Sequence, residues 1–189
     1  MIVEKLEVFP TRVFIIKNFL DPDEEKKFDE IINGINTDNK PAGSGILLRD
    51  NKEDFITDQL EFFYAKSKIE VKKHFNVDVD IFESRFNRMV TGASLPFHHH
   101  LNIVNWEQSS LRTFCILTGC YYSNTGSGFA KLRFNNPQLL SRFIGEEPAL
   151  NLETEPNTLV LFPSWACHGT TLHGSDITRK CLVMEMTLK

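Results

Sequence analysis

After Asn76 the chain consists of about eight short segments rich in β-branched and aromatic residues, and this pattern restricts the fold more than any other feature. Turn residues separate the segments, as at Thr125-Gly126-Ser127-Gly128 and His173-Gly174-Ser175-Asp176. Many short, evenly spaced strands are typical of a β-barrel or jelly roll. The predicted strands are 79–90, 95–104, 112–122, 129–135, 150–154, 158–163, 166–172 and 179–188.

The first 76 residues have a different pattern. Residues 3–8 and 11–17 alternate in hydrophobicity and predict two further strands. Asp21 followed by Pro22 and acidic residues is typical of a helix start, and apolar residues then recur at helical spacing as far as residue 36. A second helix is predicted over 52–74, and a short one over 137–144.

These elements together predict an α+β fold that is mainly β. We expect a jelly roll with the two N-terminal helices packed on one of its faces. The 189 residues suffice for one domain, in which 1–76 supports a β core formed by 77–189.

Composition and charge favour a cytoplasmic protein. The net charge of −4 gives no basic surplus for nucleic-acid binding, and no apolar run approaches membrane-spanning length. Acidic residues interrupt the N-terminal apolar stretch, which argues against a signal peptide. The four cysteines lie in apolar runs without C-x-x-C spacing, so we expect buried free thiols in a reducing compartment: Cys115, Cys120, Cys167 and Cys181.

Three consecutive histidines at 98–100 and a distant His168 indicate a metal site. Side chains alternate along a strand, so His98 and His100 would share a face while His99 points away. Imidazole binds iron, zinc, copper and nickel, and we predict His98, His100 and His168 as ligands of one ion. The alternative is that these histidines bind no metal and are structural or exposed. His173 lies in a turn-like stretch and is expected to be exposed.

Arg179 follows His168 by eleven positions and opens the last apolar strand. The alternative is that Arg179 is an ordinary surface arginine without a ligand. In combination with the histidines, its position favours a pocket-facing guanidinium that holds a carboxylate through two hydrogen bonds.

Four stretches of this sequence resemble the iron/2-oxoglutarate dioxygenases, particularly their prolyl-hydroxylase-like branch. They are LPFHHHLN at 95–102, LTGCYYSN at 117–124, LRFNNP at 132–137, and the segment 158–186 with its H-x10-R spacing. The opening LEVFPTRVFI also resembles the start of small bacterial and phage members.

The resemblance implies a double-stranded β-helix fold that binds Fe(II), 2-oxoglutarate and O₂, with ascorbate as a supporting reductant. It also implies hydroxylation of a C–H bond in an amino-acid, prolyl or other protein substrate, with release of succinate and CO₂. Carried over by position, His98 and His168 bind iron, while Arg179 and Tyr122 bind the distal carboxylate of 2-oxoglutarate. Trp106, Trp165 and Arg133 are weak candidates for the substrate side.

One position departs from the family, which usually has Asp or Glu where this chain has His100. Three neutral imidazoles leave the site one negative charge short of the usual facial triad. We keep His100 as a ligand, and Glu107 is an alternative source of the missing carboxylate.

Competing functions remain open at this point. Gly92, His98 and His100 match the opening of a cupin motif, but Val104 and Asn105 stand where its glutamate should follow. A cysteine hydrolase using Cys167 and His168 is disfavoured, because strand neighbours point to opposite faces. A non-catalytic jelly-roll binding module is the third alternative. The sequence fixes neither the substrate, which is a small molecule or a peptide, nor the oligomeric state.

Overall fold

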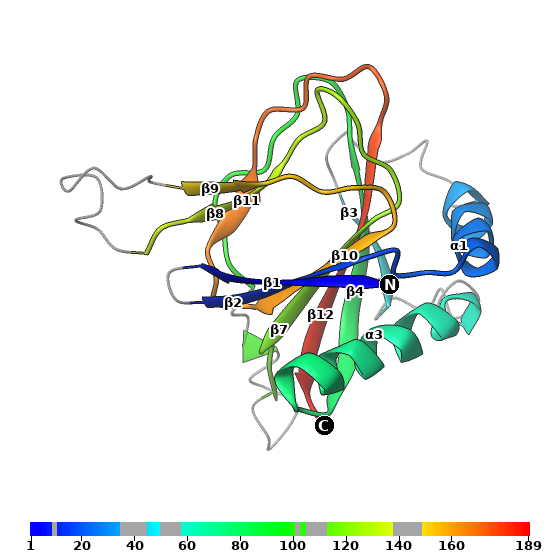
Figure 1. Cartoon of the computed structure of the whole chain (residues 1–189), viewed down its shortest axis with the longest axis vertical. Coiled ribbons are helices and arrows are strands. Elements are labelled where there is room, and N and C mark those ends of the chain that lie inside the picture. Colours follow the sequence, from blue (N-terminus) through cyan, green and yellow to red (C-terminus); the bar gives the residue numbers. More distant parts are fainter. Residues whose placement is uncertain (9–10, 35–44, 50–57, 101–102, 105–112, 138–148) are drawn as a thin grey trace.

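The computed structural model describes residues 1–8, 11–34, 45–49, 58–100, 103–104, 113–137 and 149–189, and the strands among them form two main antiparallel sheets (Figure 1). The large sheet has seven strands in the order β1-β2-β10-β7-β12-β4-β3, and the small one has the order β11-β8-β9. A two-stranded pair, β5-β6, completes the described β structure.

The strands have the following bounds. They are β1 (Ile2–Val8), β2 (Thr11–Lys17), β3 (Gly45–Arg49), β4 (Val79–Met89), β5 (Ile103–Val104), β6 (Thr113–Phe114), β7 (Leu117–Tyr122), β8 (Leu132–Asn135), β9 (Ala149–Leu152), β10 (Thr158–Pro163), β11 (His168–Thr170) and β12 (Arg179–Leu188).

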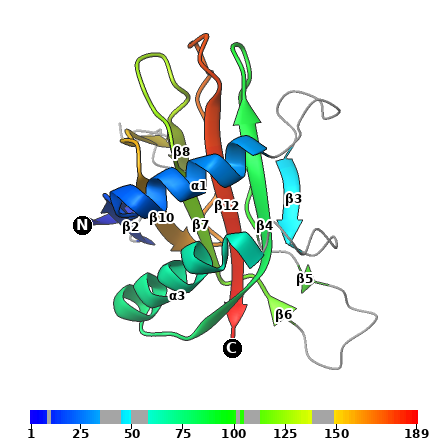
Figure 2. The same cartoon turned by 90° about the vertical axis from the view of Figure 1, so that its right-hand side faces the viewer.

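Helices α1 (Pro22–Gly34) and α3 (Glu61–Phe75) cover one face of the large sheet (Figure 2). The carboxylate of Asp21 accepts hydrogen bonds from the backbone N–H groups of Asp23 and Glu24, at 3.0 and 2.9 Å, and so caps the start of α1. Phe28 of α1 and Phe63 of α3 pack against each other and against Tyr121 of β7. No helix in the described ranges combines the length and apolar character of a membrane span.

Alternation along the central strands creates two separate cores. In β12, Leu182, Met184 and Met186 join the core beneath the helices, whereas Cys181 and Val183 face the other way. The second core fills the space between the two sheets and includes Val13, Ile15, Tyr122, Phe134, Val160 and Phe162. This two-layered β structure with helices on one outer face confirms the predicted jelly roll.

Most predicted strands are confirmed within a few residues, but the strand over 95–104 is wrong. Between residues 95 and 100 only His98 forms a β-bridge, to His168, and a regular strand, β5, covers only Ile103 and Val104. Pro96 has no N–H to donate, which disfavours a continuous ladder there. The predicted helix over 52–74 corresponds to α3. Residues 52–57 at its start and residues 138–144 of the predicted short helix lie outside the described residues.

The expected burial of the thiols also has a mixed outcome. All four cysteines are free, and Cys115, Cys120 and Cys181 are buried, while Cys167 is only half-buried.

Gly169 of β11 allows an unusually close approach of the chain that carries His98. The backbone N–H groups of His98 and His168 donate to each other's carbonyl oxygens, both at 2.8 Å, and Thr170 N–H donates to Leu95 O at 3.0 Å. A Cβ atom on Gly169 would lie 2.7 Å from Leu95 O and 3.0 Å from Pro96. The two segments can therefore pair this closely only because residue 169 has no side chain.

We predict that Gly169→Ala destabilises the protein by roughly 1–3 kcal/mol, because rigid backbone atoms must move to accept the methyl group. Urea unfolding measures this. Gly34→Ala is the matched control, since nothing lies within 4 Å of its added Cβ. Equal unfolding midpoints for the two variants would contradict the close-approach argument.

Candidate metal and carboxylate site

Three histidine side chains converge where the 95–100 segment meets β11. One ligand atom each from His98, His100 and His168 lies within 4.8 Å of the other two, and His100 Nε2 is 3.2 Å from His168 Nε2. His100 and His168 are buried and His98 is half-buried, whereas the neighbouring His99 is exposed. The sequence pattern thus brings together three imidazoles and excludes the fourth.

Hydrogen bonds at the far side of each ring fix how the three imidazoles are presented. Nδ1–H of His98 donates to Pro96 O at 2.9 Å, and Nδ1–H of His168 donates to Ala166 O at 2.8 Å. Nδ1–H of His100 donates to the carboxylate of Glu185 at 2.6 Å. With Nδ1–H directed outward, a neutral ring presents the lone pair of its Nε2 atom toward the other two rings.

These lone pairs suit a single metal ion. Burial lowers the pKa of His168 to about 3 and also lowers the pKa of His98, so both rings are neutral and able to bind metal near pH 7. The 3.2 Å between two Nε2 atoms is less than twice a metal–nitrogen bond of about 2.0–2.1 Å, so one ion can bond both. Without a metal ion, one proton between the two Nε2 atoms can bridge them as a hydrogen bond.

The histidines share a cavity of about 340 Å³ with Arg179 and Tyr122. Arg179 begins β12, and Tyr122 ends the adjacent β7. Arg85 and Asn87, from β4 on the other side of β12, also line this cavity. The site is therefore built by three neighbouring strands of the large sheet, β8 and β11 of the small sheet and the 95–100 segment.

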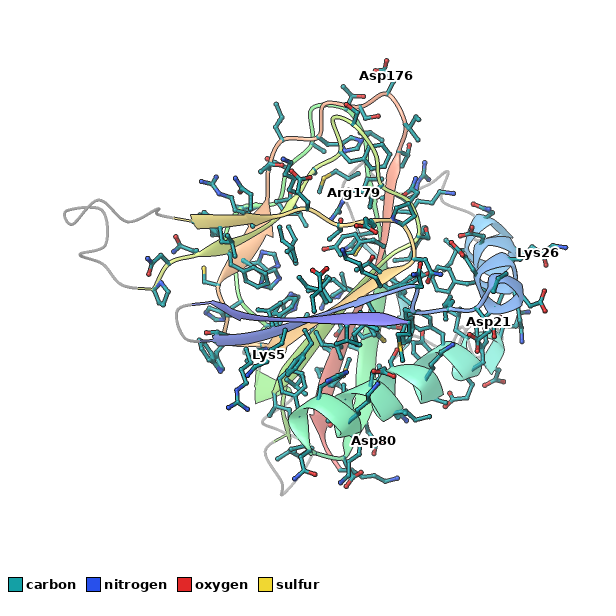
Figure 3. All side chains as sticks on the ribbon, viewed as in Figure 1. Lys5, Asp21, Lys26, Asp80, Asp176 and Arg179 are labelled. Carbon is teal, nitrogen blue, oxygen red and sulfur yellow. The ribbon has the colours of Figure 1, made fainter. Side chains whose placement is uncertain are left out.

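Arg179 is a buried cation without a counter-ion among the described residues. Only 3% of its surface is exposed, and its guanidinium carbon lies 4.7 Å from the centre of the Tyr122 ring. Its Nε atom has no hydrogen-bond partner. Figure 3 shows this side chain in the interior of the molecule, in contrast to Lys26 and Asp176 at its periphery. Because an unpaired buried charge is strongly unfavourable, the arrangement suits an anionic ligand.

The hydroxyl of Tyr122 can serve as a second donor in this cavity. Tyr122 is 1% exposed, and burial raises its pKa well above the usual value, so the hydroxyl keeps its proton. Cys120 and Cys181 line the same cavity. A neutral hydroxyl beside a guanidinium is a suitable environment for a carboxylate.

One sequence-based expectation is wrong, and several candidate residues lie outside the cavity or outside the described residues. His173 was expected to be exposed but is fully buried: its Nδ1 accepts from Ala130 N–H, and its Nε2–H donates to Ile177 O. Arg133 packs over the Phe97 ring, and Trp165 is 49% exposed and lines a separate small pocket. Trp106 and Glu107 lie outside the described residues.

Sequence reasoning missed Glu185, which contacts His100, and Arg85, which lines the cavity. A signal for Glu185 was present, since it is an isolated carboxylate in the apolar run LVMEM and shares strand parity with Arg179.

No protein-family model and no curated protein matches the chain, whereas many solved structures do. An oxidoreductase of the 2OG-Fe(II) oxygenase family from Burkholderia pseudomallei has a TM-score of 0.69 and 12% identity, over 93% of this chain and 84% of that one. HygX from Streptomyces hygroscopicus, with nickel, 2-oxoglutarate and hygromycin B bound, has a TM-score of 0.68 and 9% identity, over 94% and 83%.

EctD from S. alaskensis, with 2-oxoglutarate and 5-hydroxyectoine, has a TM-score of 0.69 and 11% identity, over 93% of this chain and 72% of that one. All three similarities extend over nearly the whole chain at very low identity. The chain therefore has the fold of the 2OG-Fe(II) oxygenases.

Proposed function

We propose that this chain is an Fe(II)- and 2-oxoglutarate-dependent dioxygenase that hydroxylates a C–H bond and releases succinate and CO₂. The observation that carries the proposal is the presence, in one cavity, of a three-imidazole cluster and a buried arginine that has no counter-ion in the part of the chain that the structure describes. A metal-binding protein would need only the imidazoles. An anion-binding module would need only Arg179. A cosubstrate that binds both a metal ion and a cation accounts for both features.

The residues present fit these ligands. Imidazole nitrogens are good ligands for Fe(II), and the proposed metal ligands are His98, His100 and His168. The planar fork of Arg179 matches the distal carboxylate of 2-oxoglutarate, and the Tyr122 hydroxyl would donate to the same group. The prolyl-hydroxylase-like branch remains an implication of the sequence resemblance alone.

The chain's own residues bind and orient the cosubstrate and exclude water from the cavity. Bound iron, 2-oxoglutarate and O₂ supply the oxidation of the C–H bond. Arg179 and Tyr122 fix one end of the cosubstrate, so its other end is directed toward the imidazoles. Buried neighbours such as Val183 and Leu132 keep the cavity wall apolar, which strengthens the charge interaction at Arg179. The protein thus contributes position and a dry environment.

For the substrate we propose a small molecule or a peptide, with an amino-acid or prolyl side chain as the form that the sequence resemblance implies. Two similar structures contain hygromycin B and 5-hydroxyectoine, which supports a small-molecule substrate. Arg85 and Asn87 are two polar residues of the cavity to which the cosubstrate proposal gives no role.

Turnover is the first test. We expect the protein, supplied with Fe(II), ascorbate and O₂, to convert 2-oxoglutarate to succinate, with the rate increased by a substrate from a panel of amino acids and prolyl peptides. Proton NMR of the succinate signal measures the yield. The His168→Ala variant is the control. Equal succinate from both proteins across the whole panel would contradict the proposal.

Binding measurements separate the roles of the two groups. Arg179→Ala should weaken 2-oxoglutarate binding to the Ni²⁺-loaded protein by on the order of 3–5 kcal/mol, because the carboxylate loses its charge partner. Ni²⁺ affinity should hardly change. The 2-oxoglutarate affinity of Arg179→Lys should lie between those of the wild type and Arg179→Ala, since lysine keeps the charge but lacks the planar fork of arginine. His168→Ala should lose Ni²⁺ binding itself. Isothermal titration measures both ligands.

Arg133→Ala is the matched control, because this arginine also has an unpartnered Nε atom but is not among the residues lining the cavity. It should leave 2-oxoglutarate affinity unchanged. The ligand-free Arg179→Met variant should be at least as stable as the wild type, since it removes an unpaired buried charge. Unchanged 2-oxoglutarate affinity in Arg179→Ala would remove the main support for an oxygenase.

A further inference from the structure

Glu185 is a buried carboxylate directly behind one of the proposed metal ligands. It lies on β12 with 2% of its surface exposed, and its Oε1 accepts the Nδ1–H of His100 at 2.6 Å. Its second oxygen, Oε2, has no hydrogen-bond partner among the residues that the structure describes. Removing a carboxylate from water is unfavourable, so a group in this position needs a strong electrostatic partner.

Glu185 stands on the opposite side of the His100 ring from the cluster. Nδ1 of His100 contacts Glu185, while Nε2 of the same ring faces His168 at 3.2 Å. The carboxylate is therefore not itself one of the three converging ligand groups. It can act on a metal ion only through the imidazole between them.

His100 differs in this respect from the other two histidines. The Nδ1–H groups of His98 and His168 donate to neutral backbone carbonyls at 2.9 and 2.8 Å. Only His100 donates to an anion, and its hydrogen bond is the shortest of the three. A carboxylate acceptor makes an imidazole more basic and more strongly bound to a metal than a carbonyl does.

The position of this contact coincides with the chain's departure from the usual ligand set. A facial triad of two histidines and one carboxylate places one negative charge at the metal, whereas three neutral imidazoles place none. His100 occupies the carboxylate position of that triad by sequence. We propose that Glu185 supplies, through His100, the negative charge that a ligating carboxylate would supply directly. This inference rests on the proposed function of the site.

An ordinary structural ion pair is the competing explanation. Arg85 lies 3.7 Å from Glu185 Oε1, but its guanidinium makes a closer contact with Glu83, and its side chain is 36% exposed. Glu185 is thus nearer to His100 than to Arg85. In the ion-pair explanation Glu185 contributes to stability alone, and its charge has no effect on metal affinity.

The test titrates Ni²⁺, an ion inert to O₂ chemistry, into the full chain at one neutral pH. Glu185→Gln keeps the side-chain shape and an oxygen that accepts from His100, and removes only the charge. We expect its Ni²⁺ affinity to fall about 10–100-fold. Glu70→Gln is the matched control: Glu70 is 4% exposed and accepts from His74 at 3.1 Å, away from the site. It should change affinity less than twofold.

A double-mutant cycle separates the charge from its structural effect. In the His100→Asp background the ligand itself carries the charge and no Nδ1–H remains, so Glu185→Gln should change Ni²⁺ affinity less than threefold. The same large loss in both backgrounds would mean that Glu185 acts on the fold, which overturns the inference. A loss below threefold in the wild-type background would also overturn it.

A measurement on the wild type keeps the inference testable if Glu185→Gln does not fold. In the Zn²⁺-loaded protein, the Nδ1–H proton of His100 should resonate well downfield of those of His98 and His168, because its acceptor is charged and closer. A chemical shift of the His100 proton that lies within the range of the other two would overturn the inference. If the wild type binds no divalent metal, the proposed function fails as well, whereas a Glu185 result alone leaves that function standing.

Discussion

The backbone bridge between His98 and His168 is the interaction on which the candidate site depends. Its two 2.8 Å hydrogen bonds join an otherwise irregular segment to β11, and His100 N–H donates to Ser164 O at 2.9 Å, so that three imidazoles lie around one point. Pairing at this distance requires Gly169, whose Cβ would otherwise meet the backbone at 2.7 Å. Backbone contacts therefore determine the positions from which the three imidazole side chains converge.

Strand β12 adds the charged part of the site by simple alternation. Its outer residues complete the core under α1 and α3, and its inner residues include Arg179 at one end and Glu185 near the other. Both inner charges are buried, and each has an atom without a hydrogen-bond partner in the described ranges. Such groups reduce the stability of the ligand-free fold, so their presence is best explained by ligands that compensate them.

Much of this could be predicted from the sequence. Hydrophobic period located the N-terminal helices and most strands, and the spacing of His98, His100, His168 and Arg179 identified the residues that meet in the cavity. The partner of His100 could not be predicted, because it depends on which strand lies behind the 95–100 segment. The predicted exposure of His173 was wrong for a similar reason, because the chain near Ala130 covers its turn-like segment.

A crystal structure of the protein soaked with Ni²⁺ and 2-oxoglutarate tests the proposed site most directly. We expect an anomalous peak bonded to His98, His100 and His168, with a carboxylate of 2-oxoglutarate against Arg179 and Tyr122. Nickel bound at another group of residues, or 2-oxoglutarate bound away from Arg179, would contradict it.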